Sequence, residues 1–262
     1  MPQAESTAQG ASSATSPDMG AALRWLKAGW RDLWTQPMPS LFYGVLVFVV
    51  SWAVIACLFS FDLSAYLMPA LAGFFIVGPI LALGLYDKSR RIENGEPVSF
   101  GAMVYVRAKS TTQILFAGVL LGLLMLLWMR AAVILYALFF GLRPFSGVEQ
   151  SLPFLIGTFD GWALMVVGSA VGGLFAAFAF AISVFSIPML YDQRIDVFTA
   201  MAVSMSTVWN NLGVMLPWGV AIVVLGVLNL ISGFVTMIVV FPLLGHATWH
   251  AYREICDTSK LD

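Results

Sequence analysis

This sequence is short of charge, cysteine and histidine. Asp, Glu, Lys and Arg make up 10% of its 262 residues, whereas an ordinary soluble domain has about 25%. The net charge of −1 gives no basic field that would attract nucleic acid. The two cysteines, Cys57 and Cys256, provide neither a disulfide framework nor a zinc-binding spacing. Nucleic-acid binding and a disulfide-rich secreted fold are therefore not expected.

Motifs of the common enzyme classes are missing from the sequence as well. It contains no GxSxG nucleophile motif, no HExxH zinc motif, no phosphate-binding loop and no dinucleotide fingerprint. Because no pattern in the sequence reaches the level of a reaction, we expect a protein without enzymatic activity.

Long hydrophobic runs are what the sequence has in excess. Hydrophobic residues make up 60% of the chain, and they lie in runs of about 20, the length of a membrane-spanning helix. The pattern predicts an all-α polytopic membrane protein with six transmembrane helices arranged as three hairpins. The spans are expected near residues 41–60, 65–86, 111–130, 161–188, 212–230 and 232–250.

Each hairpin follows a segment that we predict to be an amphipathic interfacial helix on the cytoplasmic side. The first segment, residues 21–35, combines tryptophans with cations, which suits the headgroup layer. The other two are residues 98–110 and 192–211. Eight side chains are expected at the membrane interface: Trp25, Trp30, Trp34, Tyr86, Arg90, Arg91, Tyr191 and Trp249.

The third span can be interpreted in two ways. A helix that starts at Thr111 and rises about 1.5 Å per residue reaches the far face of the bilayer near Arg130. Residues 131–158 would then form a cap on that face. Alternatively, one long tilted helix continues to Leu142.

The chain is expected to contain one folded domain. Residues 1–20 have almost no large apolar side chains and are predicted to be disordered. They also lack the basic segment and short apolar run of a signal peptide. Residues 21–255 should form the membrane domain, and residues 256–262 a polar tail.

Three segments repeat the same order of features, namely an apolar run with a proline, an aromatic residue and then polar or charged residues. They are Gly78–Arg91, Pro188–Arg194 and Pro242–Arg253. We interpret them as parts of an internal repeat in which helices leave the membrane on one side. Of the 13 lysines and arginines, 11 fall on that side. Because cationic loops stay in the cytoplasm, both termini are predicted to be cytoplasmic.

His246 and His250 are the only histidines, and they lie four residues apart on one side of a helix. Neutral imidazole is the commonest metal ligand, so a metal or haem could use them. A tetrahedral zinc site needs three or four protein ligands, however. The alternative is an interfacial pair that bonds to headgroups or to a neighbouring loop. We therefore predict no cofactor and keep haem or metal binding as the alternative.

Two further polar residues fall in or near the predicted spans. Arg130 is a candidate functional group because ionisable residues inside membranes usually have a role, although its long side chain can also reach the interface. Asn229 is expected to cap a helix or bond across helices rather than to bind substrate. Small residues predict close helix packing in two spans: Gly118, Gly122, Gly168, Gly172 and Ala176.

Three blocks of the sequence resemble a bacterial family of predicted integral membrane proteins, catalogued as a domain of unknown function (2189). The blocks are Trp25–Gly44, Gly78–Pro97 and Pro242–Tyr252, and the resemblance covers roughly residues 22–255. It implies an inner-membrane protein of proteobacteria. Some members carry a label resembling cytochrome c oxidase subunit I, but such a subunit needs more histidines than the two present here.

Together these features predict a multi-pass bacterial inner-membrane protein. We expect it to be a non-enzymatic accessory or scaffold element of a membrane complex. It would contact the bilayer and either a membrane-protein partner or a second copy of itself. The alternatives are a small-solute transporter or channel, and a haem- or metal-binding protein that uses His246 and His250.

Overall fold

The structure is a computed structural model that describes residues 20–63, 66–106, 108–141, 153 and 155–256. Within these residues every regular element is a helix, and no strand occurs among them. The all-α class predicted from the long apolar runs is therefore confirmed for this part of the chain.

Among the described residues, four helical stretches are long and apolar enough to cross a membrane. They are α2 (Pro37–Ser60), α6 (Thr111–Phe140), α11 (Leu212–Ile231) and the stretch Phe159–Asp192, which contains α8 (Phe159–Ser183) and α9 (Ser186–Asp192). Along the 30 residues of α6 only Ile114, Ala117 and Leu121 are buried. Most of this apolar surface is thus left for lipid to cover.

The predicted arrangement of six spans is not confirmed, because two of the six segments fall outside this set. α3 (Leu67–Leu81) ends soon after Pro79, which has no N–H to donate to the helix. α4 (Leu83–Glu93) begins directly after Ala82. α12 (Met237–Ile255) is not apolar throughout, because histidines and charged residues occupy its second half.

α6 is longer than the third span expected to end near residue 130. It runs without interruption past Arg130 to Phe140 and so follows the alternative of one long helix. At a rise of about 1.5 Å per residue its length is about 45 Å, whereas the hydrocarbon core is about 30 Å thick. Of the cap predicted for residues 131–158, residues 131–140 belong to α6, whereas residues 142–152 and 154 lie outside the described residues.

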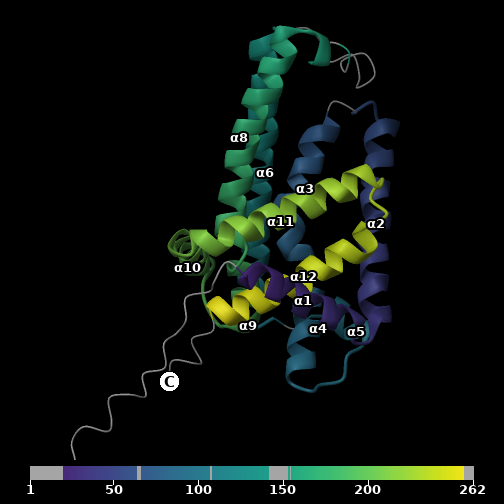
Figure 1. Cartoon of the computed structure of the whole chain (residues 1–262), viewed down its shortest axis with the longest axis vertical. Helices are drawn as coiled ribbons and strands as arrows, with labels where there is room; N and C mark the ends of the chain where they lie inside the picture. The colour runs from purple at the N-terminus through teal and green to yellow at the C-terminus, as the bar shows by residue number, and fades with distance from the viewer. Residues whose placement is uncertain (1–19, 64–65, 107, 142–152, 154, 257–262) are drawn as a thin grey trace, which may run out of the picture.

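Figure 1 shows helices that run in two main directions. α2, α3, α6 and α8 stand along the long axis, and α11 and α12 run obliquely across them. At one end lie α1 (Ala21–Trp34), α4, α5 (Phe100–Val104), α9 and α10 (Val197–Asn210). We call these five helices, together with residues 246–255 of α12, the end layer.

Two of the three segments predicted to be interfacial each contain a 14-residue helix. α1 covers nearly all of residues 21–35, whereas α10 begins at Val197 and so covers only the later part of residues 192–211, because residue 192 still belongs to α9. The third segment, residues 98–110, contains only the five-residue helix α5. The interfacial position of these helices stays a prediction.

The end layer contains most of the large buried side chains. Those with almost no exposed surface include Trp25, Tyr86, Lys88, Tyr191, Trp249 and Tyr252. By contrast, α2 buries only Ser40, Gly44 and Val47 along its 24 residues. The core of the protein therefore lies mainly in the end layer and not between the long apolar helices.

α12 is held between α1 and α2 by close backbone contacts at two glycines. A Cβ atom at Gly44 of α2 would overlap the carbonyl group of Ile238. A Cβ atom at Gly29 of α1 would lie 2.7 Å from the backbone nitrogen of Ala247. Both positions require glycine because the facing atoms belong to the backbone and cannot move aside cheaply.

The small residues singled out in the sequence occupy different environments. Gly172 lies against the ring of Trp128 on α6, and Gly118 faces Ile80 on α3. Gly122 and Gly168 have open space around them, and Ala176 is exposed. At Gly172 the large indole ring of Trp128 therefore fills the contact between α6 and α8.

Candidate functional site

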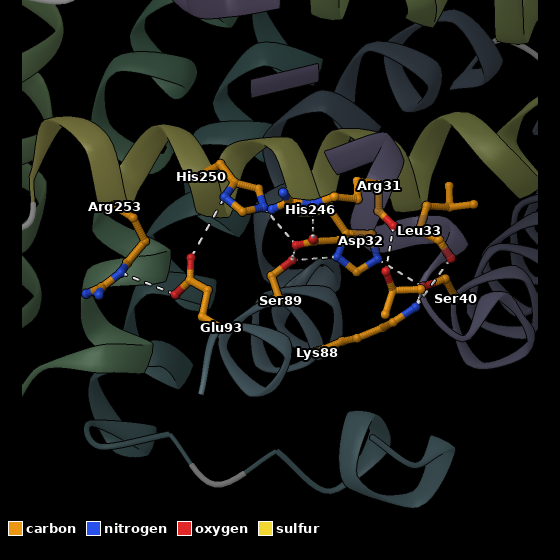
Figure 2. Close-up of polar contacts among 11 residues, drawn as sticks. Arg31, Asp32, Leu33, Ser40, Lys88, Ser89, Glu93, His246, His250 and Arg253 are labelled. Carbon is orange, nitrogen blue, oxygen red and sulfur yellow. Dashed lines mark hydrogen bonds and ion pairs between the residues drawn. The ribbon is translucent and has the colours of Figure 1, made fainter. Parts of the chain in front are cut away.

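A buried polar cluster joins four helices in the end layer and at its border with α2. Its members are Asp32 of α1, Ser40 of α2, Lys88 and Ser89 of α4, and His246 and His250 of α12. Figure 2 shows these side chains converging between the helices. We call this set the polar cluster.

His246 lies at the centre of the polar cluster and is completely buried. Its Nε2 atom is 2.9 Å from the hydroxyl of Ser40, and its Nδ1 atom is 2.8 Å from the hydroxyl of Ser89 (Figure 2). Burial lowers the pKa of His246 to about 3, so the ring is neutral at physiological pH. One ring nitrogen must then donate a hydrogen bond and the other must accept one.

The hydroxyl groups decide which nitrogen of His246 carries the proton. Ser89 Oγ donates its only proton to Asp32 Oδ2 over 2.8 Å, so it must accept from Nδ1 of His246. Nε2 therefore accepts from Ser40 Oγ, and Lys88 Nζ donates to that same oxygen over 2.8 Å. The hydrogen bonds form one directed chain from the ammonium group of Lys88 to the carboxylate of Asp32.

Asp32 is the acceptor at the end of this chain and is 1% exposed. Its Oδ2 atom also accepts from His250 Nε2 over 2.7 Å. Burial opposes ionisation of Asp32, but the hydrogen bonds from His250 and Ser89 outweigh it and hold the pKa below its ordinary value. The carboxyl group is thus a buried anion whose charge is stabilised by protein donors.

Lys88 anchors the other end of the chain at the junction of α1 and α2. Besides Ser40, its ammonium group donates to the carbonyl of Gln36 at 2.9 Å and to that of Leu33 at 3.4 Å. A cation at a helix C-terminus satisfies carbonyl groups that lack a partner within the helix. Burial lowers the pKa of Lys88 to about 8. Lys88 therefore fixes the turn between the first helix and the first span.

His250 connects the polar cluster to the protein surface. Its side chain is 15% exposed, and its Nδ1 atom lies 3.8 Å from the carboxylate of Glu93. Glu93 in turn pairs with Arg253 at 3.4 Å (Figure 2). The cluster therefore ends at the surface in a row of charged groups that α4 and α12 contribute.

An aromatic cluster lies beside the polar cluster and brings the three repeated segments together. Trp249 is 6.4 Å from Tyr86 and 5.7 Å from Tyr191, measured between ring centroids. The hydroxyl of Tyr191 donates to Asp87 over 2.6 Å, and Arg91 pairs with the same carboxylate at 2.6 Å. The segments thus meet one another in the end layer.

This packing corrects four of the eight residues expected at the membrane interface. Trp25, Tyr86, Tyr191 and Trp249 are at most 1% exposed, so they contact protein instead of lipid headgroups. The other four retain exposed surface: Trp30, Trp34, Arg90 and Arg91. The physical reason is that these rings pack against other aromatic rings of the protein, Trp25 against Trp218 and Trp249 against Tyr86 and Tyr191.

In the structure both histidines are hydrogen-bonded to protein groups. Both ring nitrogens of His246 are engaged by serine hydroxyls, and His250 is engaged by Asp32. Among the residues that the structure describes, no group of three or more His, Cys, Asp or Glu side chains could hold a metal ion. The geometry instead matches a hydrogen-bonded pair that faces neighbouring helices.

Arg130 and Asn229 are not members of the polar cluster. Arg130 is exposed on α6. Asn229 is buried near the end of α11, where its side-chain oxygen accepts from Thr236 over 2.7 Å. Its backbone oxygen accepts from Phe234 over 2.7 Å. Asn229 therefore fixes the turn between α11 and α12.

Four members of the polar cluster were not expected from the sequence: Asp32, Ser40, Lys88 and Ser89. One signal was available for Asp32, which follows the buried Trp25 and Gly29 at helical spacing and so lies on the inner face of α1. For Lys88 no such signal exists, because it stands among other charged residues at the end of a predicted span.

Comparison with known proteins gives a family match for the central part of the chain. Residues 67–192 match the family described as "Predicted integral membrane protein (DUF2189)". No curated protein and no solved structure was found to match. The matched region runs from α3 to α9 and includes Lys88 and Ser89, whereas the other members of the polar cluster lie outside it.

Proposed function

Since residues 67–192 match a family of predicted integral membrane proteins (DUF2189), we propose that the chain is a non-enzymatic scaffold or accessory element of a membrane complex. We place it in the inner membrane of a bacterium, with the end layer and both termini on the cytoplasmic side. The end layer is the part that holds the partner.

The observation that carries this proposal is the closed state of the polar cluster. Asp32, Lys88 and His246 are all buried and are bonded to one another through serine hydroxyls. A catalytic group has to reach a substrate, whereas these groups reach only other helices. Their effect is to lock α1, α2, α4 and α12 into one rigid shape, which is what a docking platform requires.

The cytoplasmic side of the end layer is supported by its cations. Arg24, Lys27 and Arg31 lie on α1, and Lys88, Arg90 and Arg91 lie on α4. Cationic segments close to membrane helices stay in the cytoplasm. The exposed outer surfaces of α1 and α10 support a position of both helices at the membrane interface.

Purification of the tagged chain from native membranes in mild detergent tests the scaffold role. We expect a second protein to be recovered in stoichiometric amount. The Asp32→Ala variant, whose polar cluster is opened, should remain in the membrane. It should no longer recover the second protein. Lys109→Gln is a matched control, because Lys109 is 53% exposed and lies outside the cluster. Recovery of the wild-type chain alone would contradict the proposal.

A further inference from the structure

α1 has an outer stripe of exposed, mostly apolar side chains that no other helix of the described structure covers. The inner face of the helix, which includes Trp25 and Leu33, is buried against α12 and α11. The outer stripe consists of exposed side chains three or four residues apart: Leu23, Lys27, Trp30 and Trp34. Residues at this spacing lie on one side of a helix. The helix therefore has apolar side chains on two faces, one packed against the protein and one exposed.

The outer stripe combines indole rings with positive charge. Trp30 and Trp34 are about half exposed and pack edge to face, with ring centroids 5.6 Å apart. Lys27 lies on the stripe, and the side chain of Arg31 beside it is 74% exposed. Tryptophan suits a site that is apolar on one side and wet on the other. The cations beside these rings, Lys27 and Arg31, could bind an anionic group that lies next to the indole rings.

The outer stripe is continuous with a surface that faces lipid. Trp34 precedes the first residue of α2, Pro37, by three positions. The first turns of that span expose Met38 (76%) and Phe42 (55%). Figure 1 shows α1 lying across the long axis close to the start of α2. This continuity suits α1 to the level at which acyl chains meet headgroups.

From this placement and charge we propose that the outer stripe of α1 is a binding surface for the headgroups of anionic phospholipids. The indole rings lie at the acyl boundary, and Lys27 and Arg31 bind the lipid phosphates. Asp32 and Lys88 hold the helix from its inner side, so the binding surface is rigid before lipid arrives. The inference depends on the membrane position of the chain and is independent of any scaffold role.

α10 supplies an internal comparison, because it has a similar stripe without charge. Its exposed stripe contains Phe198, Met205 and Trp209, and no Asp, Glu, Lys or Arg occurs in the helix. Phe198 packs against Phe116, which is exposed on the first turns of α6, with ring centroids 5.6 Å apart. α10 therefore also meets lipid, and it should do so without preference for anionic headgroups.

Photochemical labelling of the full chain in nanodiscs tests the inference. The probes are phosphatidylglycerol and phosphatidylcholine that carry the same photoreactive group close to the headgroup, and labelled peptides are identified by mass spectrometry. We expect phosphatidylglycerol to label α1 more strongly, and salt to reduce the difference. Labelling by phosphatidylglycerol should fall roughly fivefold for each cation removed in Lys27→Gln and Arg31→Gln. α10 should be labelled equally by both lipids.

A charge-conserving variant separates lipid binding from an effect on folding. Lys27→Arg combined with Arg31→Lys should retain the labelling of the wild type, because both phosphate-binding charges remain. Equal labelling of α1 by the two lipids would overturn the inference. Undiminished labelling in the doubly neutral variant, or loss of labelling in the charge-conserving variant, would overturn it as well.

Discussion

Each buried polar residue of the polar cluster is stabilised by a partner from another helix. The ammonium group of Lys88 and the carboxylate of Asp32 do not touch, because Ser40, His246 and Ser89 lie between them. Placing neutral groups between two buried charges keeps each charge hydrogen-bonded without requiring direct contact. One atom is left over, since Asp32 Oδ1 has no hydrogen-bond partner among the described residues.

Removal of the buried carboxylate should destabilise the fold strongly. Asp32→Ala leaves the hydroxyl of Ser89 and the imidazole of His250 without their acceptor, so we expect the free energy of unfolding to fall by about 2–4 kcal/mol. Arg31→Ala, at the exposed neighbouring position, should change it by less than about 0.5 kcal/mol. Thermal unfolding in detergent measures both, and an equal change in the two variants would refute the assignment.

The direction of the hydrogen bonds predicts the tautomer of His246. The neutral ring should carry its proton on Nδ1, because Ser89 has no proton left to give after bonding Asp32. Nitrogen NMR of the histidine-labelled protein reports the protonated nitrogen directly. In Ser89→Ala the hydroxyl that requires this tautomer is gone, so the preference for a proton on Nδ1 should weaken. A wild-type ring protonated on Nε2 would contradict the directed chain.

The lowered pKa of Lys88 predicts how stability changes with pH on the alkaline side. The folded protein releases the proton near pH 8, whereas the unfolded chain keeps it to about pH 10.4. Because the unfolded state binds more protons between these values, stability should rise with pH in that window. Lys88→Met should lack this rise. Unfolding temperatures of the two proteins, measured from about pH 7 to about pH 10, should therefore diverge, and parallel curves would exclude the effect.

Whole helices are positioned by where glycine permits close approach. α12 contacts α2 through Gly44 and α1 through Gly29, and it carries both histidines into the polar cluster. α6 and α8 meet differently, through the large ring of Trp128 packed on Gly172. The oblique α12 is thus fixed more tightly than the long helices that face lipid.

Replacing a contact glycine should separate α2 from α12. Gly44→Ala places a methyl group against the carbonyl of Ile238, so we expect the free energy of unfolding to fall by about 1–3 kcal/mol. Gly122→Ala is the matched control, because nothing lies within 4 Å of its added methyl group. Alanine is the better helix former there, so stability should rise by up to about 1 kcal/mol. Similar losses in both variants would show that glycine content, not contact, matters.

At the scale of the whole molecule, the two ends of the helical bundle differ. One end is a packed layer with buried aromatic and charged side chains, whereas the described residues at the other end are helix ends and the turn after α2. In the part of the chain that the structure describes, four stretches meet the length and composition needed to cross a membrane. This asymmetry, together with the cations of the end layer, determines the orientation that we propose.

Reporter fusions test that orientation. A reporter at residue 92, at the end of α4, should report the cytoplasm, and so should a reporter at the C-terminus. A reporter at residue 62, after α2, should report the opposite side, because α2 separates it from the end layer. A periplasmic signal at residue 92 or at the C-terminus would reverse the orientation. It would also contradict the cytoplasmic platform.

Several helix bounds were predictable because hydropathy and periodicity are local properties. The sequence placed α1 within residues 21–35, where the helix covers Ala21–Trp34, and α11 within 212–230, where it covers Leu212–Ile231. The break between α3 and α4 was not predicted, although Pro79 was visible. A proline bends a helix in some surroundings and ends it in others, and the neighbouring helices decide which occurs.

The polar cluster was only partly predictable because its bonds join residues far apart in the chain. Asp32 and His250 are separated by 218 positions, and Ser89 and His246 by 157. The sequence singled out the two histidines by their spacing on one helix. It carried no signal for Ser40 or Lys88, because a serine in an apolar helix and a lysine in a charged segment are both common.

By itself, the sequence determined that this chain is helical and that it belongs in a membrane, because both follow from the length and composition of its apolar runs. Only the tertiary structure decided what happens at the ends of those runs. There, aromatic and polar residues of three similar segments meet in one core instead of facing lipid, since packing against one another buries more apolar surface and supplies a partner for each buried charge.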